Sequence, residues 1–279
     1  MTEADSRPAG PGRGAVGVEV VRGRSTVVRC QASNPLKLLT PRRRSKAAWI
    51  YTSTFGGGLV AGDEVKLDVS VAERAICCLT TQSATKVYRS PQGEPARQEL
   101  RATVSTGGVL VIVPDPVICF AEAIHEQEQF IEVSAGGTVV VLDWLTSGRR
   151  GCGEQWAFRR YLSRLNIDYD GERVLTDSLL LDQDDGPLDS PFRMGRFHCL
   201  AALVMIGDHV AETNKHTCAD VNLTSVGRDD VLIESVSTIR DGAIVRMIGD
   251  TPERVAERLN RRLEFTRATL GSTPWERKW

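Results

Sequence analysis

Alternating apolar and polar residues mark many short segments in the first 183 residues of the chain. From Val65 to Val71, for example, valine and leucine alternate with Lys66, Asp68 and Ser70, a period typical of a half-buried β-strand. Similar alternation or β-branched runs predict strands at Val16–Val21, Thr26–Cys30, Ala75–Thr81, Leu100–Val104, Val109–Val113, Phe130–Val133, Thr138–Leu142 and Val174–Leu181. Glycine-containing turns separate these segments, and no helical pattern lies between them. We therefore expect an all-β-dominated fold and not a doubly wound α/β fold.

Helical signals are confined to the last third of the chain. The apolar segment Phe192–Ala211 predicts one helix, and Thr251-Pro252-Glu253 begins a second, with threonine as N-cap and proline at the first helical position. Further strands are expected at Val221–Val226, Val231–Val236 and Ala243–Ile248. The segment Asp182–Pro191, rich in aspartate and proline, predicts a loop. No internal repeat is detected.

The composition narrows the class of protein. With 279 residues, 41% hydrophobic and 25% charged, the chain is typical of a globular protein, and its net charge of −1 disfavours a nucleic-acid-binding function. No apolar run is long enough to span a membrane. Residues 1–14 lack the apolar core of a signal peptide, so we expect a disordered tail there and a single domain over residues 15–279. Seven cysteines without a C-x-x-C motif indicate reduced thiols and a cytoplasmic location.

Known catalytic motifs are missing from the sequence. No G-x-x-x-x-G-K-[ST] loop is present, and Gly56–Asp63 is not followed by a helical pattern, so we interpret it as a tight β-connection. An enzyme with Cys119 or Cys152 as nucleophile and a histidine base is an alternative that no local context supports. The histidines and cysteines between His198 and Cys218 suggest either a transition-metal site or core packing.

Large aromatic residues suggest a partner surface. They lie near expected turns or near the last helix, where exposure would make an isolated chain poorly soluble. These residues are Trp144, Trp156, Phe265, Trp275 and Trp279.

The run Leu79–Ser90 is unusual for a strand because it carries several hydroxyls and an amide, which need partners or water if they are buried. This run and Phe55–Asp63 resemble, in order and spacing, the two signature segments of the UreD (UreH) family of urease accessory proteins. Pro114–Ala123, Ser147–Trp156 and Val174–Leu181 resemble further segments of that family. The resemblance extends over residues 15–183 and, by length and element order, into the remainder.

The resemblance implies a β-helix-like stack of sheets with a small helical part near the C-terminus. It also implies a scaffold without enzymatic activity, which assembles with a UreF-type helical accessory protein and, through the complex, with a UreG-type GTPase on apo-urease. We expect neither a nucleic acid nor a membrane among the partners. The resemblance is compatible with two copies of the chain in the complex. Ni²⁺ would be in transit through an internal water-filled tunnel, with no tightly bound cofactor.

Oxygen ligands suit an ion that has to be released, because imidazole and thiolate sites would hold nickel tightly. The acidic residues of the matching segments are therefore candidates for a nickel conduit: Asp63, Glu64, Asp143, Glu154 and Asp177. Candidates for the polar lining of the tunnel are Thr80, Thr81, Gln82 and Thr85, and the motif glycines are Gly57, Gly58 and Gly62. Each acid is explained as well by a turn cap or an exposed strand end.

Two questions remain open at this point. The chain could instead be a purely structural module that bridges the activation complex without touching nickel. Cys152 stands in the Gly-Arg to Glu-aromatic segment, and a sulfur contribution to metal handling is left open there.

Overall fold

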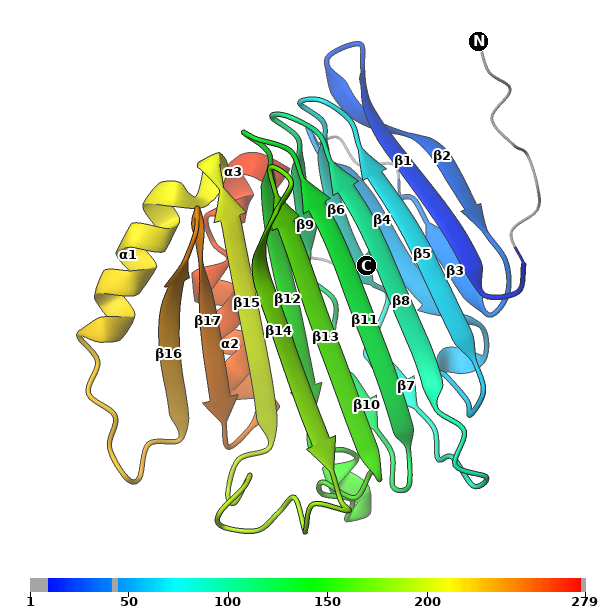
Figure 1. Cartoon of the computed structure of the whole chain (residues 1–279), viewed down its shortest axis with the longest axis vertical. Coiled ribbons are helices and arrows are strands. Elements are labelled where there is room, and N and C mark those ends of the chain that lie inside the picture. The colour runs from blue at the N-terminus through cyan, green and yellow to red at the C-terminus, as the bar shows by residue number, and fades with distance from the viewer. Residues whose placement is uncertain (1–9, 42–44, 277–279) are drawn as a thin grey trace.

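Two β-sheets form the body of the protein in a computed structural model that describes residues 10–41 and 45–276 (Figure 1). The seven-stranded sheet has the order β14-β13-β11-β8-β5-β1-β2. Its strands are β1 (Arg13–Val21), β2 (Arg24–Ala32), β5 (Glu64–Val71), β8 (Ala96–Val104), β11 (Ile124–Val133), β13 (Arg160–Tyr169) and β14 (Glu172–Asp182). Residues 1–9 lie outside the described residues, and β1 begins two residues before the domain boundary expected at residue 15.

The ten-stranded sheet contains eight strands in the order β16-β17-β15-β12-β9-β6-β4-β3, together with the short strands β7 and β10. Its strands are β3 (Leu36–Leu39), β4 (Ala48–Thr54), β6 (Ile76–Thr81), β7 (Thr85–Val87), β9 (Val109–Ile112), β10 (Val117–Cys119), β12 (Thr138–Thr146), β15 (Cys199–Gly207), β16 (Leu232–Ile239) and β17 (Gly242–Gly249). The helices are α1 (Ala211–Asn222), α2 (Pro252–Arg262) and α3 (Thr266–Leu270), with 3₁₀ turns η1 (Phe55–Gly57), η2 (Arg150–Cys152) and η3 (Asp208–Val210).

From β5 to β13 the chain passes back and forth between the two sheets, and successive strands within each sheet are parallel. Tight turns with similar backbone geometry make three of these crossings, since Arg74, Gly107 and Gly136 all have φ between 57° and 73°. The chain thus contains a structural repeat, and the similar sequences of residues 104–109 (VSTGGV) and 133–138 (VSAGGT) mark two of its turns. The all-β, β-helix-like stack with a small helical part near the C-terminus is confirmed.

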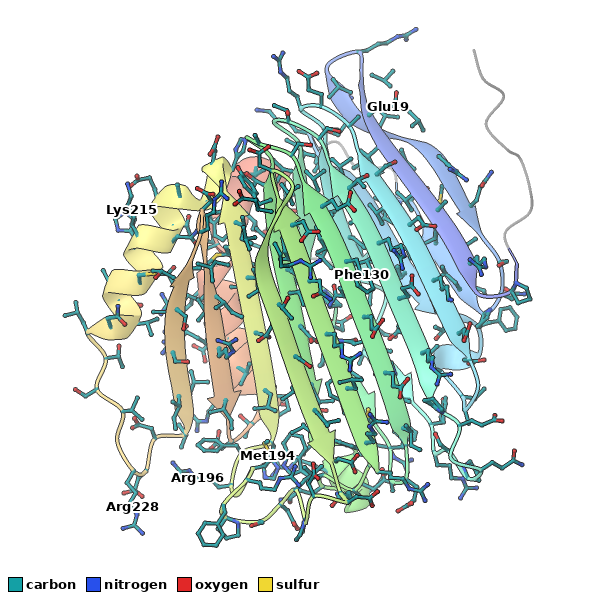
Figure 2. All side chains as sticks on the ribbon, in the orientation of Figure 1. Glu19, Phe130, Met194, Arg196, Lys215 and Arg228 are labelled. Atoms are coloured by element: carbon teal, nitrogen blue, oxygen red, sulfur yellow. The ribbon has the colours of Figure 1, made fainter. Side chains whose placement is uncertain are left out.

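Packing explains why these segments become strands. Alternate residues of the seven-stranded sheet, such as Val65, Leu67 and Val69, point into one core between the sheets, while Lys66 and Asp68 face outward. The outer face of that sheet is covered by polar side chains (Figure 2), and Phe130 lies there with the Arg101 guanidinium 4.9 Å from its ring centroid. The other face of the ten-stranded sheet packs against α2 and α3 in a second apolar core.

Two secondary-structure predictions are wrong. The expected helix Phe192–Ala211 is a loop followed by β15, which pairs with β12 and β17 and is buried on both faces. A short apolar run of this kind has no periodicity that separates a buried strand from a buried helix. The expected strand Val221–Val226 is the end of α1 followed by a loop. The predicted helix after Thr251 is confirmed as α2, with the Thr251 side chain accepting a hydrogen bond from the N–H of Arg254.

The prediction of an aromatic partner surface is also partly wrong, because Trp144 and Trp156 are buried. Phe265 and Trp275 are half-buried against the second core, and Trp279 lies outside the described residues. Among the residues that the structure describes, no helix has the length and apolar character needed to cross a bilayer.

Candidate functional site

A row of polar side chains crosses the interior between the sheets at right angles to the strands. Gln98 of β8 lies opposite Gln127 of β11, which in turn lies opposite Ser163 of β13. These residues occupy inward-facing positions, where the same strands otherwise place aliphatic side chains. Neighbouring strands are about 4.8 Å apart, so the row extends roughly 10 Å across the sheet.

Asp143 approaches this row from β12 of the opposite sheet. Its carboxylate accepts hydrogen bonds from Gln127 Nε2 at 2.8 Å, from the Tyr161 hydroxyl at 3.3 Å and from the Ser163 hydroxyl. All three donors are neutral, and within residues 10–41 and 45–276 no lysine or arginine forms an ion pair with Asp143. Burial therefore raises the pKa of the Asp143 carboxyl above its ordinary value, although the three hydrogen bonds partly oppose the shift.

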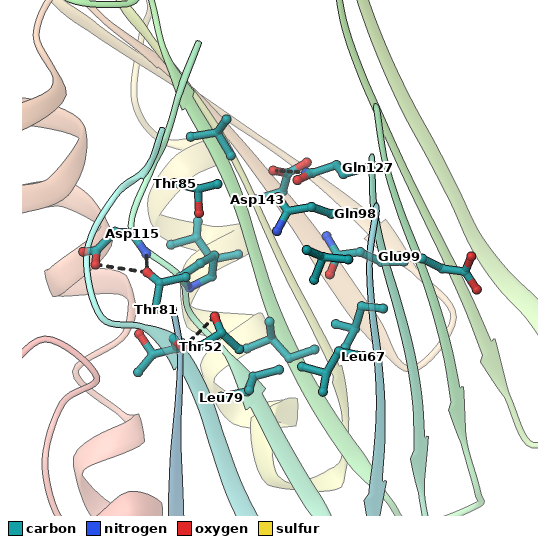
Figure 3. A pocket seen from close by; sticks show the side chains of 18 of the residues that line it. Thr52, Leu67, Leu79, Thr81, Thr85, Gln98, Glu99, Asp115, Gln127 and Asp143 are labelled. Atoms are coloured by element: carbon teal, nitrogen blue, oxygen red, sulfur yellow. Dashed lines mark hydrogen bonds between the residues drawn. The ribbon is translucent and has the colours of Figure 1, made fainter. Parts of the chain in front are cut away.

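Three cavities lie along the polar row. The first, of about 120 Å³, is bordered by Asp143, Gln98 and Gln127 and is shown in Figure 3. The second, of about 160 Å³, shares Asp143 and Trp144 with the first and continues toward β14 and β17. The third, of about 40 Å³, shares Gln98, Thr81 and Thr85 with the first and is bordered by Gly57 at its other end. The first two volumes are each large enough for several water molecules.

The first cavity reaches a break in the ten-stranded sheet. Strands β6 and β7 are separated by residues 82–84, and the neighbouring strands β9 and β10 are separated by residues 113–116. Thr81 and Asp115 are joined across this break, because Thr81 Oγ1 donates to Asp115 Oδ2 at 3.0 Å and accepts from the Asp115 N–H at 2.7 Å (Figure 3). Thr80 donates to the Val113 carbonyl at 2.6 Å. The hydroxyls of Thr80 and Thr81 thus bond to protein groups, and Thr80, Thr81 and Thr85 border the cavity.

The second cavity ends at an ion pair between the two sheets. Asp177 of β14 and Arg246 of β17 both border it, and Arg246 donates a hydrogen bond to Asp177 Oδ1 at 2.6 Å. The side chain of Asp177 is 25% exposed and that of Arg246 is 46% exposed, which places the pair at the surface. The negative charge of Asp177 acts on Asp143 across this cavity.

Two of the five candidate acids, Asp143 and Asp177, therefore border the same cavity. Asp63 instead caps a turn, since its Oδ2 accepts the Val60 N–H at 2.9 Å, and Glu64 is exposed beside Lys66. Glu154 is held by Arg149, which lowers the pKa of its carboxyl, and accepts the Ala121 N–H at 3.1 Å. None of these last three borders the three cavities described here.

Of the remaining predicted positions, Gln82 and the motif glycines, only Gly57 borders one of the three cavities. Gln82 donates its backbone N–H to the Thr52 carbonyl and does not border the three cavities. Gly57 borders the third cavity, and a Cβ at Gly58 would lie 2.5 Å from Tyr88 Cε2, which makes this glycine a packing requirement. Gly62 has a φ of 82° in the turn that Asp63 caps.

The histidines and cysteines between residues 198 and 218 do not form one site. His198 precedes β15 and His209 follows it, so a nine-residue strand of about 30 Å separates them. Among the described residues, no group of three or more histidine, cysteine, aspartate or glutamate side chains is arranged to hold a metal ion. Cys152 is exposed in η2, and burial raises the pKa of the Cys119 thiol far above its ordinary value, which disfavours a thiolate nucleophile.

Sequence reasoning missed part of the polar lining, chiefly Gln98, Gln127, Ser163, Asp115 and Arg246. In β11 the inward residues His125, Gln127 and Gln129 alternate with the outward residues Glu126 and Glu128, so residues 125–129 show no hydrophobic period. This polar run, directly before the apolar end of the strand, was the available signal.

The fold and the interior define the class of protein: a flattened two-sheet β-solenoid whose interior carries a row of polar side chains around the Asp143 carboxylate, beside adjoining cavities. Comparison with known proteins gives the family, since the family model for the UreD urease accessory protein matches residues 10–279. A urease accessory protein UreD of Sorangium cellulosum is 43% identical over 93% of this chain and 81% of that protein. One of Anaeromyxobacter is 40% identical over 95% and 89%, and the urease accessory protein D of Arabidopsis thaliana is 31% identical over 94% and 99%. The chain belongs to the UreD family of urease accessory proteins, which confirms the resemblance.

Proposed function

We propose that this urease accessory protein conveys Ni²⁺ through its interior to apo-urease, in a complex with a UreF-type helical protein and a UreG-type GTPase. Asp143 is the observation that carries the proposal. A carboxylate enclosed between two sheets costs free energy unless a positive charge compensates it. Asp143 is half-buried beside two cavities, and the described residues provide only neutral donors to it. A cation that passes between the two adjoining cavities would supply the missing charge.

The polar groups among the otherwise apolar lining residues suit transit better than storage. Amides, hydroxyls and single carboxylates are oxygen donors, which bind nickel more weakly than imidazole or thiolate does. The cavities leave room for water, so the ion would keep part of its hydration shell and exchange one ligand at a time. In this proposal Asp143 is a transient ligand at the middle of the route, and Asp115 and Asp177 stand toward its two ends.

The chain itself performs no chemical step in this proposal. It keeps the ion away from competing ligands and orients the route toward urease, while GTP hydrolysis belongs to the partner GTPase. We place this assembly in the cytoplasm, where seven cysteines without a C-x-x-C motif would stay reduced.

The test removes the central charge without changing the shape of the side chain. Asp143→Asn, co-expressed with urease and the other accessory proteins, is expected to lower the nickel content and activity of urease while the accessory complex still co-purifies. Glu126→Gln is the matched control, because Glu126 lies on the outer face of β11, where it pairs with Arg97 at 3.0 Å, and it borders none of the three cavities. This control is expected to leave nickel loading unchanged.

The alternative function, a structural bridge that never contacts nickel, predicts a different result. In that case Asp143→Asn would load urease like the wild type, or would lose loading only in parallel with loss of the complex. Nickel analysis of urease together with size-exclusion chromatography of the complex separates these outcomes.

A further inference from the structure

The open edge between the two sheets is joined by two arginines of the β16–β17 hairpin. Arg246 of β17 reaches Asp177 in the middle of β14, and Arg240, which follows β16, reaches Glu172 at the start of β14. Both ion pairs connect the same elements, but only Arg246 and Asp177 border the second cavity. The two pairs are therefore similar in construction and different in position.

We infer that Arg246 is a built-in gate of the second cavity, which occupies Asp177 until a divalent cation displaces it. This inference rests on the proposed function and adds a regulatory element to the same route. While the pair is closed, the guanidinium neutralises Asp177 and presents positive charge to any cation at the mouth. When Arg246 turns away, the carboxylates of Asp177 and Asp143 border one cavity with no cation between them.

The physical properties of the pair suit a gate. An ion pair exposed to this degree is screened by water and contributes little to stability, so it opens at low cost. Arginine cannot lose its proton at physiological pH, so the closed pair keeps the charge of Asp177 neutralised. A divalent cation can replace Arg246 as the partner of Asp177, because two positive charges attract a carboxylate more strongly than the single charge of a guanidinium does.

The gate is tested by titrating Ni²⁺ into the full-length chain by isothermal titration calorimetry. Arg246→Gln is expected to tighten nickel binding about two- to fivefold, the factor that corresponds to losing the competition of one exposed ion pair. Arg240→Gln removes the matched pair outside the cavity and is expected to leave the affinity unchanged. In an Asp177→Asn background, Arg246→Gln is expected to have no further effect, which a double-mutant cycle measures.

Different failures have different meanings. If nickel binding depends on Asp143 but Arg246→Gln and Arg240→Gln behave alike, the gate is overturned and the conduit stands. If nickel binding is indifferent to Asp143, Asp177 and Arg246 together, both the gate and the proposed function are overturned. Thermal unfolding of each variant shows whether it remains folded, and Arg246→Lys, which keeps the charge, is expected to restore wild-type affinity.

Discussion

The two faces of the ten-stranded sheet are both buried, yet they differ in chemistry. Its outer face packs under α2 and α3 through Leu203, Leu259 and Leu263, all of which are fully buried and apolar. Its inner face packs against a second sheet and accommodates Asp143, hydroxyls and water-sized cavities. A helix can shift and tilt to fill the surface beneath it, whereas two long hydrogen-bonded sheets are held at a fixed distance. The difference shows how a β-solenoid can retain polar groups and cavities between its sheets without losing its core.

The largest effect is expected on the sealed outer face. Leu259→Ala removes a fully buried side chain of α2 and leaves a cavity that neighbouring residues cannot fill. Such changes reduce the free energy of unfolding by about 2–5 kcal/mol. Urea denaturation measures this loss, and a decrease below 1 kcal/mol would mean that the helical layer is loosely packed like the inner face.

An effect of opposite sign is expected at Asp143. Because burial raises the pKa of this carboxyl, the folded state holds its proton more tightly than the unfolded state does, and stability falls as pH rises from the unfolded pKa to the folded one. Asp143→Asn removes the buried charge and should stabilise the protein by roughly 1 kcal/mol at neutral pH.

The pH dependence gives this second prediction its control. The stability advantage of Asp143→Asn over the wild type should grow as pH rises above about 4, the ordinary carboxyl pKa, and level off once the folded carboxyl is ionised. Melting temperatures of both proteins over that range measure it. An advantage that shrinks with rising pH would show that a positive charge already compensates Asp143.

The smallest effect is expected at the edge of the first cavity. Gln129 borders that cavity and is half-buried, so Gln129→Leu exchanges a polar for an apolar surface of similar size beside water. Its free energy of unfolding should change by no more than about 0.5 kcal/mol. A loss as large as that of Leu259→Ala would show that the inner face is packed as tightly as the outer one.

Local signals in the sequence were sufficient for most strands and for α2, because alternation and the Thr251 cap act over a few residues. They failed at β15, where a strand buried on both faces reads as a uniform apolar run. For the site, Asp143 and Asp177 were among the candidate acids, but only the pairing of strands brings them to one cavity. Gln98, Gln127 and Ser163 become neighbours through strand register, and Arg246 meets Asp177 through a contact between distant segments, so neither feature is visible in local sequence.

The parallel strands of the solenoid have consequences for association as well. At one end the antiparallel hairpin β1–β2 closes the seven-stranded sheet, and at the other end the hairpin β13–β14 does so. Each hairpin carries an irregularity in its register, between Gly17 and Val18 and between Ile167 and Asp168. Twisted, charged edge strands are poor templates for another chain. The terminal hairpins therefore limit end-to-end polymerisation, a hazard for any protein built from stacked parallel strands.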